Sequence, residues 1–238
     1  MVDERRPLDP LVSKVAPPPE VAARVRAAIA ETPASRATVS RRIGLALIAV
    51  PLSILAGLYG SRIVFHGRPL FRLDLWFLPE LAFGQRLFVL VLLAGIATGV
   101  ALIPGRRGLG ARAILLLGAS LAVAPLYTLV TMVDPIGSPV GDAAARRLHP
   151  LGLPCALVAF AVGMLALGAF GLALRRAVPS APVNRAAALG AAAGGWAGVA
   201  LFLQCPAKNT LHLLVGHSIP VALFALLGAI ALPRLLRP

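Results

Sequence analysis

Cysteine and histidine are the side chains of this 238-residue sequence with the most distinctive chemistry. The cysteines are Cys155 and Cys205, and the histidines are His66, His149, His212 and His217. Thiolate and imidazole are common ligands of soft metal ions, and thiolates also react with oxidants. Two cysteines without a CxxC or Cys/His spacing do not indicate a structural zinc site, and they form at most one disulfide. The alternatives for Cys155 and Cys205 are a structural disulfide, two inert small apolar residues, or a sensor of metals or oxidants.

The two histidines nearest the C-terminus are His212 and His217, which are five residues apart. On an ideal helix this separation corresponds to about 140°. Two histidines that bind one metal from a single helix are normally four residues apart. We therefore expect no resident metal and no cofactor, with His212 and His217 as weak candidate ligands. Each histidine alone is expected to be a polar group near the membrane surface.

Long apolar segments must position these residues. Apolar side chains make up 58% of the sequence and charged ones 13%, against about 45–50% and about 25% in soluble domains. Six apolar blocks are each long enough to cross a hydrocarbon core about 30 Å thick. They cover residues 43–64, 87–104, 113–133, 151–174, 186–205 and 211–232. The runs lack the alternation of a transmembrane β-barrel, so the expected fold class is all-α, a polytopic membrane protein with six transmembrane helices.

The basic residues predict the orientation of the bundle. Sixteen of the 23 lysines and arginines fall in the N-terminal segment, in the loops 105–112 and 175–185, and at the C-terminus. Basic residues are retained on the cytoplasmic side, so both termini are expected there (N-in/C-in) in a bacterial inner membrane. Cys155 and Cys205 then share the oxidising outer face, where a disulfide can persist. The net charge of +14 is attributed to topology and lipid contacts, with no direct nucleic-acid binding.

Residues 1–42 form a polar, proline-bearing arm ahead of the transmembrane domain, residues 43–238. The arm holds two short patterns of helical spacing, and the second favours a helix over Glu20–Glu31. They predict a partner-binding segment that folds on contact; the alternative is an amphipathic segment lying on the anionic inner leaflet. The residues expected to bind the partner are Leu11, Val12, Val15, Val21, Val25 and Ile29.

Two further segments outside this scheme carry expectations of their own. His66–Arg86 is rich in aromatic and apolar residues, which predicts a lid in the outer headgroup layer. Gly190, Gly194 and Gly198 recur at a spacing of four in the fifth span, which lets helices approach closely. We favour packing within one chain, with a homo-oligomer through this span as the alternative.

Ionisable residues that would support transport or catalysis are missing from the interior of the six spans. Asp, Glu, Lys and Arg occur there only near the ends, which argues against ion-coupled transport. The sequence contains no HExxH, GxSxG or paired acidic motif, so we expect no enzyme. Two rivals stay open: a small-molecule or lipid transporter or accessory membrane subunit, and a redox or metal enzyme that uses the outer cysteines and histidines.

The layout resembles a known family. A cysteine opens the fourth span, Leu-Arg-Arg-Ala-Val-Pro-Ser-Ala-Pro follows that span, and the Gly/Ala-rich fifth span ends in Cys205. With the short arm and the final Pro-Arg-Leu-Leu-Arg at residues 233–237, the sequence is similar to the six-span anti-sigma factors of the negative-regulator-of-sigma-F type.

That resemblance implies a function for the arm and for the cysteines. The arm would bind an extracytoplasmic-function sigma factor, withhold it from RNA polymerase and release it in a stress response on an envelope signal. The family's two cysteines would correspond to Cys155 and Cys205. The sequence departs from the family pattern in its last span, which has His212 and His217 in place of an aromatic pair near the outer end.

Overall fold

The computed structural model describes residues 18–21, 23–24, 36–64, 81–103, 109–132, 151–174, 182–205 and 210–235. The chain divides into two units, residues 1–38 and 39–238. In the first unit, residues 19–21 and 23–24 are helical, and the Val21 N–H donates to the Pro18 carbonyl at 2.8 Å. Val21 is 47% exposed. The other expected partner-binding residues lie outside the described residues, as does most of the expected lid.

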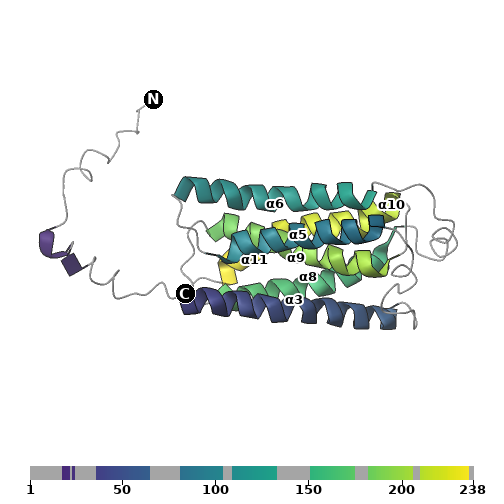
Figure 1. Ribbon diagram of the computed structural model, residues 1–238, viewed down its shortest axis with the longest axis horizontal. Helices are drawn as coiled ribbons and strands as arrows, with labels where there is room; N and C mark the ends of the chain where they lie inside the picture. The colour runs from purple at the N-terminus through teal and green to yellow at the C-terminus, as the bar shows by residue number, and fades with distance from the viewer. Residues whose placement is uncertain are drawn as a thin grey trace, which may run out of the picture. The chain divides into compact units, whose positions relative to one another are not determined.

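Within the described residues, six helices are long and apolar enough to cross a membrane, which confirms the predicted fold class. The first five are α3 (Arg36–Val64), α5 (Leu81–Leu102), α6 (Leu109–Met132), α8 (Leu153–Leu174) and α9 (Pro182–Gln204). The sixth consists of α10 (Thr210–Leu213), the π-helix η1 (Leu214–Ser218) and α11 (Ile219–Leu235). Figure 1 shows these helices running side by side. The N-in/C-in orientation stays a prediction.

Four helices, α3, α5, α6 and α9, begin four or more residues earlier than their apolar blocks indicate. The first turns of α5 contain Leu81–Arg86, so this part of the expected lid is instead the start of a membrane helix. Similarly, α9 begins at Pro182, within the expected loop 175–185. Proline is well tolerated in the first turn of a helix, and the polar residues that follow it do not interrupt the backbone hydrogen bonds. A count of apolar residues therefore places these starts too late.

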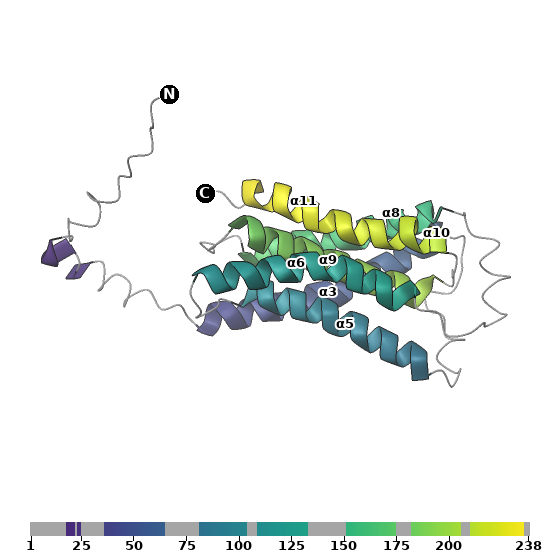
Figure 2. The same ribbon diagram turned by 90° about the horizontal axis from the view of Figure 1, so that it is seen from above.

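The helix α9 lies at the centre of the bundle, in contact with α5, α6, α8 and α11 (Figure 2). Its glycines make this possible, because they let neighbouring backbones come close. A Cβ atom on Gly190 would overlap the carbonyl oxygen of Phe224, and one on Gly194 would lie 2.6 Å from that of Val221. Gly198 meets the ring of Tyr127. The stripe thus packs within the chain, because all three glycines already contact other helices of the bundle. A homo-oligomer through this span stays a prediction.

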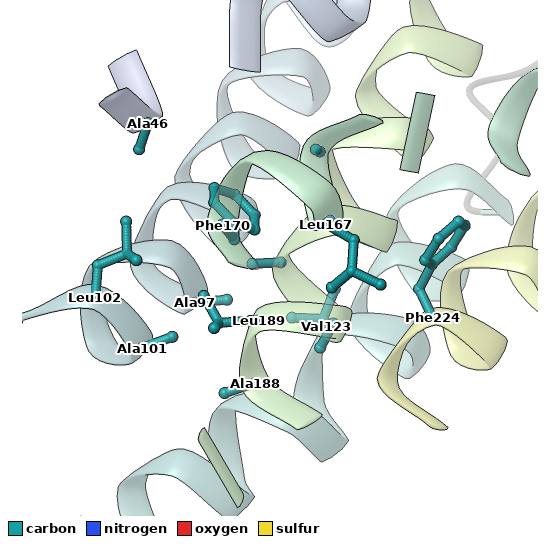
Figure 3. Close-up of a cluster of buried hydrophobic side chains, with 14 of the residues drawn as sticks. Ala46, Ala97, Ala101, Leu102, Val123, Leu167, Phe170, Ala188, Leu189 and Phe224 are labelled. Atoms are coloured by element: carbon teal, nitrogen blue, oxygen red, sulfur yellow. The ribbon is translucent and has the colours of Figure 1, made fainter. Parts of the chain in front are cut away.

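The apolar side chains divide between a packed interior and an exposed outer surface. Figure 3 shows Leu189 of α9 close to Ala97 of α5, in a cluster that includes Phe170 of α8. Outside, Leu47, Phe88 and Ile114 are among many large apolar side chains, and they are 69%, 67% and 71% exposed. Soluble proteins rarely expose apolar surface this extensively. With six helices of sufficient length, the chain is a multi-pass membrane protein.

Two arginines satisfy the last carbonyl groups of α5. Arg185, 4% exposed, donates from Nε to the Ala101 carbonyl at 2.6 Å and from a terminal nitrogen to the Leu102 carbonyl at 3.1 Å. Arg112 donates to the Val100 carbonyl at 2.9 Å and also to the carbonyl of Ile103. The final carbonyls of a helix have no partner within the helix, and a cation there also opposes the negative end of its dipole. These contacts hold α5 against α6 and α9.

We expect Arg185→Ala to lower the free energy of unfolding by about 2 kcal/mol, because two buried carbonyl groups lose charged donors. The change is measured by thermal or denaturant unfolding of the detergent-purified protein. Arg234→Ala is the matched control, since Arg234 is exposed in the last turn of α11. An equal loss of unfolding free energy in the two variants would show that the hydrogen bonds of Arg185 to the Ala101 and Leu102 carbonyls do not stabilise the protein beyond the effect of the positive charge.

Candidate functional site

The candidate site is a cluster of two cysteines and two histidines at one end of the bundle. Cys155 lies in the first turn of α8, Cys205 directly follows α9, His212 belongs to α10 and His217 to η1. One ligand atom of each residue lies within 4.8 Å of those of the other three. Among the described residues, the structure thus brings together all the sequence-predicted cysteine and histidine candidates that it contains.

The two sulfur atoms of the cluster are 3.7 Å apart, and the residues are present as thiols. Cys155 is buried and Cys205 is half-buried. A disulfide requires sulfurs about 2.0 Å apart, so the predicted bridge stays a prediction. The contact nevertheless makes the two thiols direct neighbours, although 50 residues separate them in the chain.

The two histidines meet because the sixth span is not a regular α-helix. In η1 the Ile219 N–H bonds the carbonyl of Leu214, five residues earlier, as is typical of a π-helix. This wider turn brings residues five apart closer to one face, and the rings of His212 and His217 pack edge to face with centroids 5.5 Å apart. Both side chains are 2% exposed. The expectation that they point 140° apart is wrong because it assumed an ideal α-helix, whereas their position near the membrane surface stays a prediction.

Hydrogen bonds orient each imidazole. His212 Nε2 lies 3.3 Å from the sulfur of Cys205. His217 Nδ1 lies 3.4 Å from the hydroxyl of Tyr127, which donates to the Gly198 carbonyl at 3.2 Å. The other ring nitrogen of His217, Nε2, is buried without a hydrogen-bond partner. These contacts orient both rings of the cluster. They leave Nε2 of His217 buried and without a hydrogen-bond partner.

Sequence reasoning missed Tyr127. This residue lies in α6, is 1% exposed and contacts His217 from 90 residues away in the chain. Its only signal in the sequence is a phenolic hydroxyl inside an apolar span, since a buried tyrosine usually finds a hydrogen-bond partner. That signal predicts a partner for Tyr127 without identifying which residue it is.

Two glycines bring η1 against the start of α8. Gly152 has a positive φ of 64°, and a Cβ atom there would lie 2.9 Å from the Cα of Gly216. In return, a Cβ on Gly216 would lie 2.7 Å from the Gly152 carbonyl oxygen. Only glycine accepts both the positive φ at 152 and this backbone approach without strain. The contact holds the segment with both histidines next to the helix that carries Cys155.

An apolar wall surrounds the cysteines. Cys155 packs in a buried cluster with Val158, Val162, Ala197 and Leu201, and Cys205 borders the same cluster. Ile54 of α3 also packs against it. In addition, a Cβ on Gly57 of α3 would overlap Val162. The first transmembrane helix is therefore in direct contact with the helix that carries Cys155.

The chemistry available to the cluster follows from its donor atoms. Two sulfurs and two imidazole nitrogens are soft or borderline donors, and the cluster includes no carboxylate. Neighbouring thiols can be oxidised to a disulfide, and the same atoms can bind a soft metal ion. The described cluster has the geometry for either reaction.

Comparison with known proteins identifies the family. No match was found among the curated proteins or among the solved structures. Residues 27–237 match the family described as "Negative regulator of sigma F" (NrsF), and the match includes all six helices and both cysteines. Because this match covers nearly the whole chain, the protein belongs to the negative-regulator-of-sigma-F family, whose name makes its members anti-sigma factors.

Proposed function

We propose that this protein holds an extracytoplasmic-function sigma factor through its N-terminal arm, at the cytoplasmic face of a bacterial inner membrane. It releases the sigma factor when the cluster of Cys155, Cys205, His212 and His217 responds to a redox or metal signal in the envelope. The observation that carries this proposal is the family match, which begins inside the arm at residue 27 and continues through the transmembrane helices.

The positions of the helix ends support this division of roles. The cluster lies at the end of the bundle where α10 begins, and α3 starts at the opposite end (Figure 1). In the chain, α3 contains the last residues of the arm, 36–42, and Gly57 of α3 packs against Val162 of α8. A displacement of α8 at Cys155 can therefore reach the helix that leads into the arm. Such coupling requires two arrangements of the bundle with different affinities for the sigma factor.

A protein with this role has no catalytic step of its own. Its activity is the difference in sigma-factor affinity between two states of the bundle, and a change in the cluster shifts their populations. Arm residues with apolar side chains supply the binding surface, as in other helical segments that fold into a groove. Lipids surround the exposed apolar side chains of the helices.

Sigma-factor binding by the full-length protein tests the proposal. We expect Val25→Asp to weaken binding at least about tenfold, because a buried aspartate in an apolar groove costs more than the 1.4 kcal/mol that a tenfold change represents. Binding is measured by co-purification of the detergent-solubilised protein with the sigma factor, alongside transcription from a promoter that depends on it.

Ala34→Asp is the matched control, because it adds the same charge to the arm outside the apolar pattern. It should leave both binding and transcription close to those of the unmodified protein. If the full-length protein neither binds a sigma factor nor lowers its transcription, the proposed function is wrong. Retained binding by Val25→Asp would instead move the contact to another part of the arm.

A further inference from the structure

We propose that Cys155, Cys205, His212 and His217 bind one divalent d¹⁰ transition-metal ion, with Zn²⁺ as the reference, in a closed tetrahedral site. The four residues belong to three different spans, and one ligand atom of each lies within 4.8 Å of the others. Metal binding itself does not depend on sigma-factor binding. Its use as a signal rests on the proposed function.

The distances between donor atoms fit a tetrahedral ion. With Zn–S near 2.3 Å and Zn–N near 2.0–2.1 Å, a tetrahedron has about 3.8 Å between two sulfurs and about 3.6 Å between sulfur and nitrogen. Here the two sulfurs are 3.7 Å apart, and the sulfur of Cys205 is 3.3 Å from Nε2 of His212. These two pairs match the tetrahedron to within a few tenths of an ångström. All four donor atoms lie within 4.8 Å of one another, so the wider pairs must close by up to about 1.5 Å around an ion.

The hydrogen bond between His217 and Tyr127 leaves Nε2 of His217 available to a metal ion. The Tyr127 hydroxyl donates its hydrogen to the Gly198 carbonyl, so it accepts one from His217 Nδ1. A neutral imidazole with its hydrogen on Nδ1 has a lone pair on Nε2. That nitrogen is buried without a hydrogen-bond partner, which is costly unless something else binds it. A ligating histidine usually donates its second ring N–H to an oxygen in this way.

Charge balance selects a divalent ion. Two thiolates and two neutral imidazoles carry a total charge of −2, which a divalent cation neutralises. The site is enclosed by apolar residues of α8 and α9, where an uncompensated charge is costly. Binding releases two thiol protons to water for each ion that enters and changes no oxidation state. A monovalent soft ion such as Cu⁺ would leave one negative charge in this apolar surrounding.

Four protein ligands leave no open coordination position, which is typical of structural rather than catalytic sites. The bound ion would cross-link the start of α8, the end of α9 and the sixth span. Its arrival or loss would therefore change how firmly these three ends are held together. The π-helix is needed for this site, because it brings His217 to the side of the helix where His212 lies.

The test uses the full-length protein, purified in detergent under reducing conditions and freed of metal with a chelator. Co²⁺ is the probe, because its absorption reports thiolate ligation and tetrahedral geometry directly. We expect one Co²⁺ per chain, with thiolate-to-metal absorption and tetrahedral d–d bands that Zn²⁺ abolishes. Absence of the thiolate absorption from the unmodified protein would overturn the proposal.

Single substitutions identify the ligands. We expect a more than about 100-fold loss of Co²⁺ affinity from each of four variants: Cys155→Ser, Cys205→Ser, His212→Ala and His217→Ala. Loss of a residue that only hydrogen-bonds a metal ligand already costs about 10–100-fold in affinity, and loss of the ligand itself should cost more. Met164→Leu is the matched control: it removes a sulfur from the lipid-exposed side of α8, where Met164 is 54% exposed, and should leave the affinity unchanged. Unchanged affinity in both histidine variants would overturn the four-ligand site.

Tyr127→Phe provides a test that does not remove a ligand. It deletes only the hydroxyl that orients His217, and we expect a 10–100-fold weaker affinity with the tetrahedral spectrum retained. Helical content and monodispersity of every variant are checked first, so that loss of the site is separated from misfolding. An affinity equal to that of the unmodified protein would overturn the role of Tyr127 in fixing the imidazole.

Two independent readouts separate this proposal from the proposed function. Protein that binds Co²⁺ but no sigma factor supports the metal site and overturns the anti-sigma role of the arm. Protein that holds a sigma factor but binds no Co²⁺ supports the anti-sigma role and overturns the metal site. If both bind, Zn²⁺ should change sigma-factor retention by the unmodified protein and not by His217→Ala; equal retention would overturn the regulatory use of the metal.

Discussion

Gly190→Ala is expected to lower the free energy of unfolding by about 3 kcal/mol, at the upper end of the range for overpacked cores. The added methyl group would overlap the carbonyl oxygen of Phe224 and would lie 3.0 Å from the Cα of Gly228. Both are backbone atoms of α11, which cannot rotate away as a side chain can. The two helices must therefore move apart at this point, which weakens the packing between them.

The matched control for this variant is Gly168→Ala in α8. A Cβ atom at Gly168 meets nothing within 4 Å, and alanine is the better helix former by about 1 kcal/mol. We expect unchanged or slightly higher stability there. Thermal unfolding of both variants in the same detergent measures the difference. Equal stability of the two variants would contradict the close approach of α9 and α11.

The second large effect is expected from Gly216→Ala, which should weaken Co²⁺ binding about 100-fold, equivalent to about 2.7 kcal/mol. The methyl group would lie 2.7 Å from the Gly152 carbonyl oxygen and 3.0 Å from the Gly152 Cα. It would push η1 away from the start of α8, and with it both histidines from Cys155. No donor atom is removed, so the loss of affinity would report geometry alone.

Gly118→Ala controls for the general effect of replacing a helical glycine, because a Cβ at Gly118 in α6 meets nothing within 4 Å. It should bind Co²⁺ as the unmodified protein does. The comparison is made by competition with a chromophoric chelator, together with unfolding curves. Undiminished Co²⁺ affinity in Gly216→Ala would mean that the contact between Gly152 and Gly216 does not position the ligands.

The membrane spans could be predicted from the sequence because their signal is local. Each apolar block forms a helix, and the block 151–174 ends at Leu174 as α8 does. The errors occur where the first turns of a helix contain polar residues, as in α5 from Leu81 and in α9 from Pro182. Such a helix continues into residues that no longer favour lipid. Hydropathy marks the part of a helix inside the bilayer and not the position of its first hydrogen bond.

The candidate site could be predicted only in part, because its decisive features are not local. Cys155 and Cys205 were identified from their positions at span ends. The π-helix was not, since Leu214–Ser218 has no residue that forces a wider turn, and its geometry depends on the approach of Gly216 to Gly152. The contact between Tyr127 and His217 likewise depends on tertiary packing across 90 residues.

The enclosure of α9 by four neighbouring helices has a consequence for biosynthesis. The fifth span is synthesised before the sixth, so the glycine face of α9 that contacts α11 stays uncovered by that helix until α11 has been synthesised. Chains that stop before Phe224 would keep that face uncovered, with no partner for Gly190 or Gly194. Membrane quality-control proteases would then have a ready means of distinguishing aborted chains from finished ones.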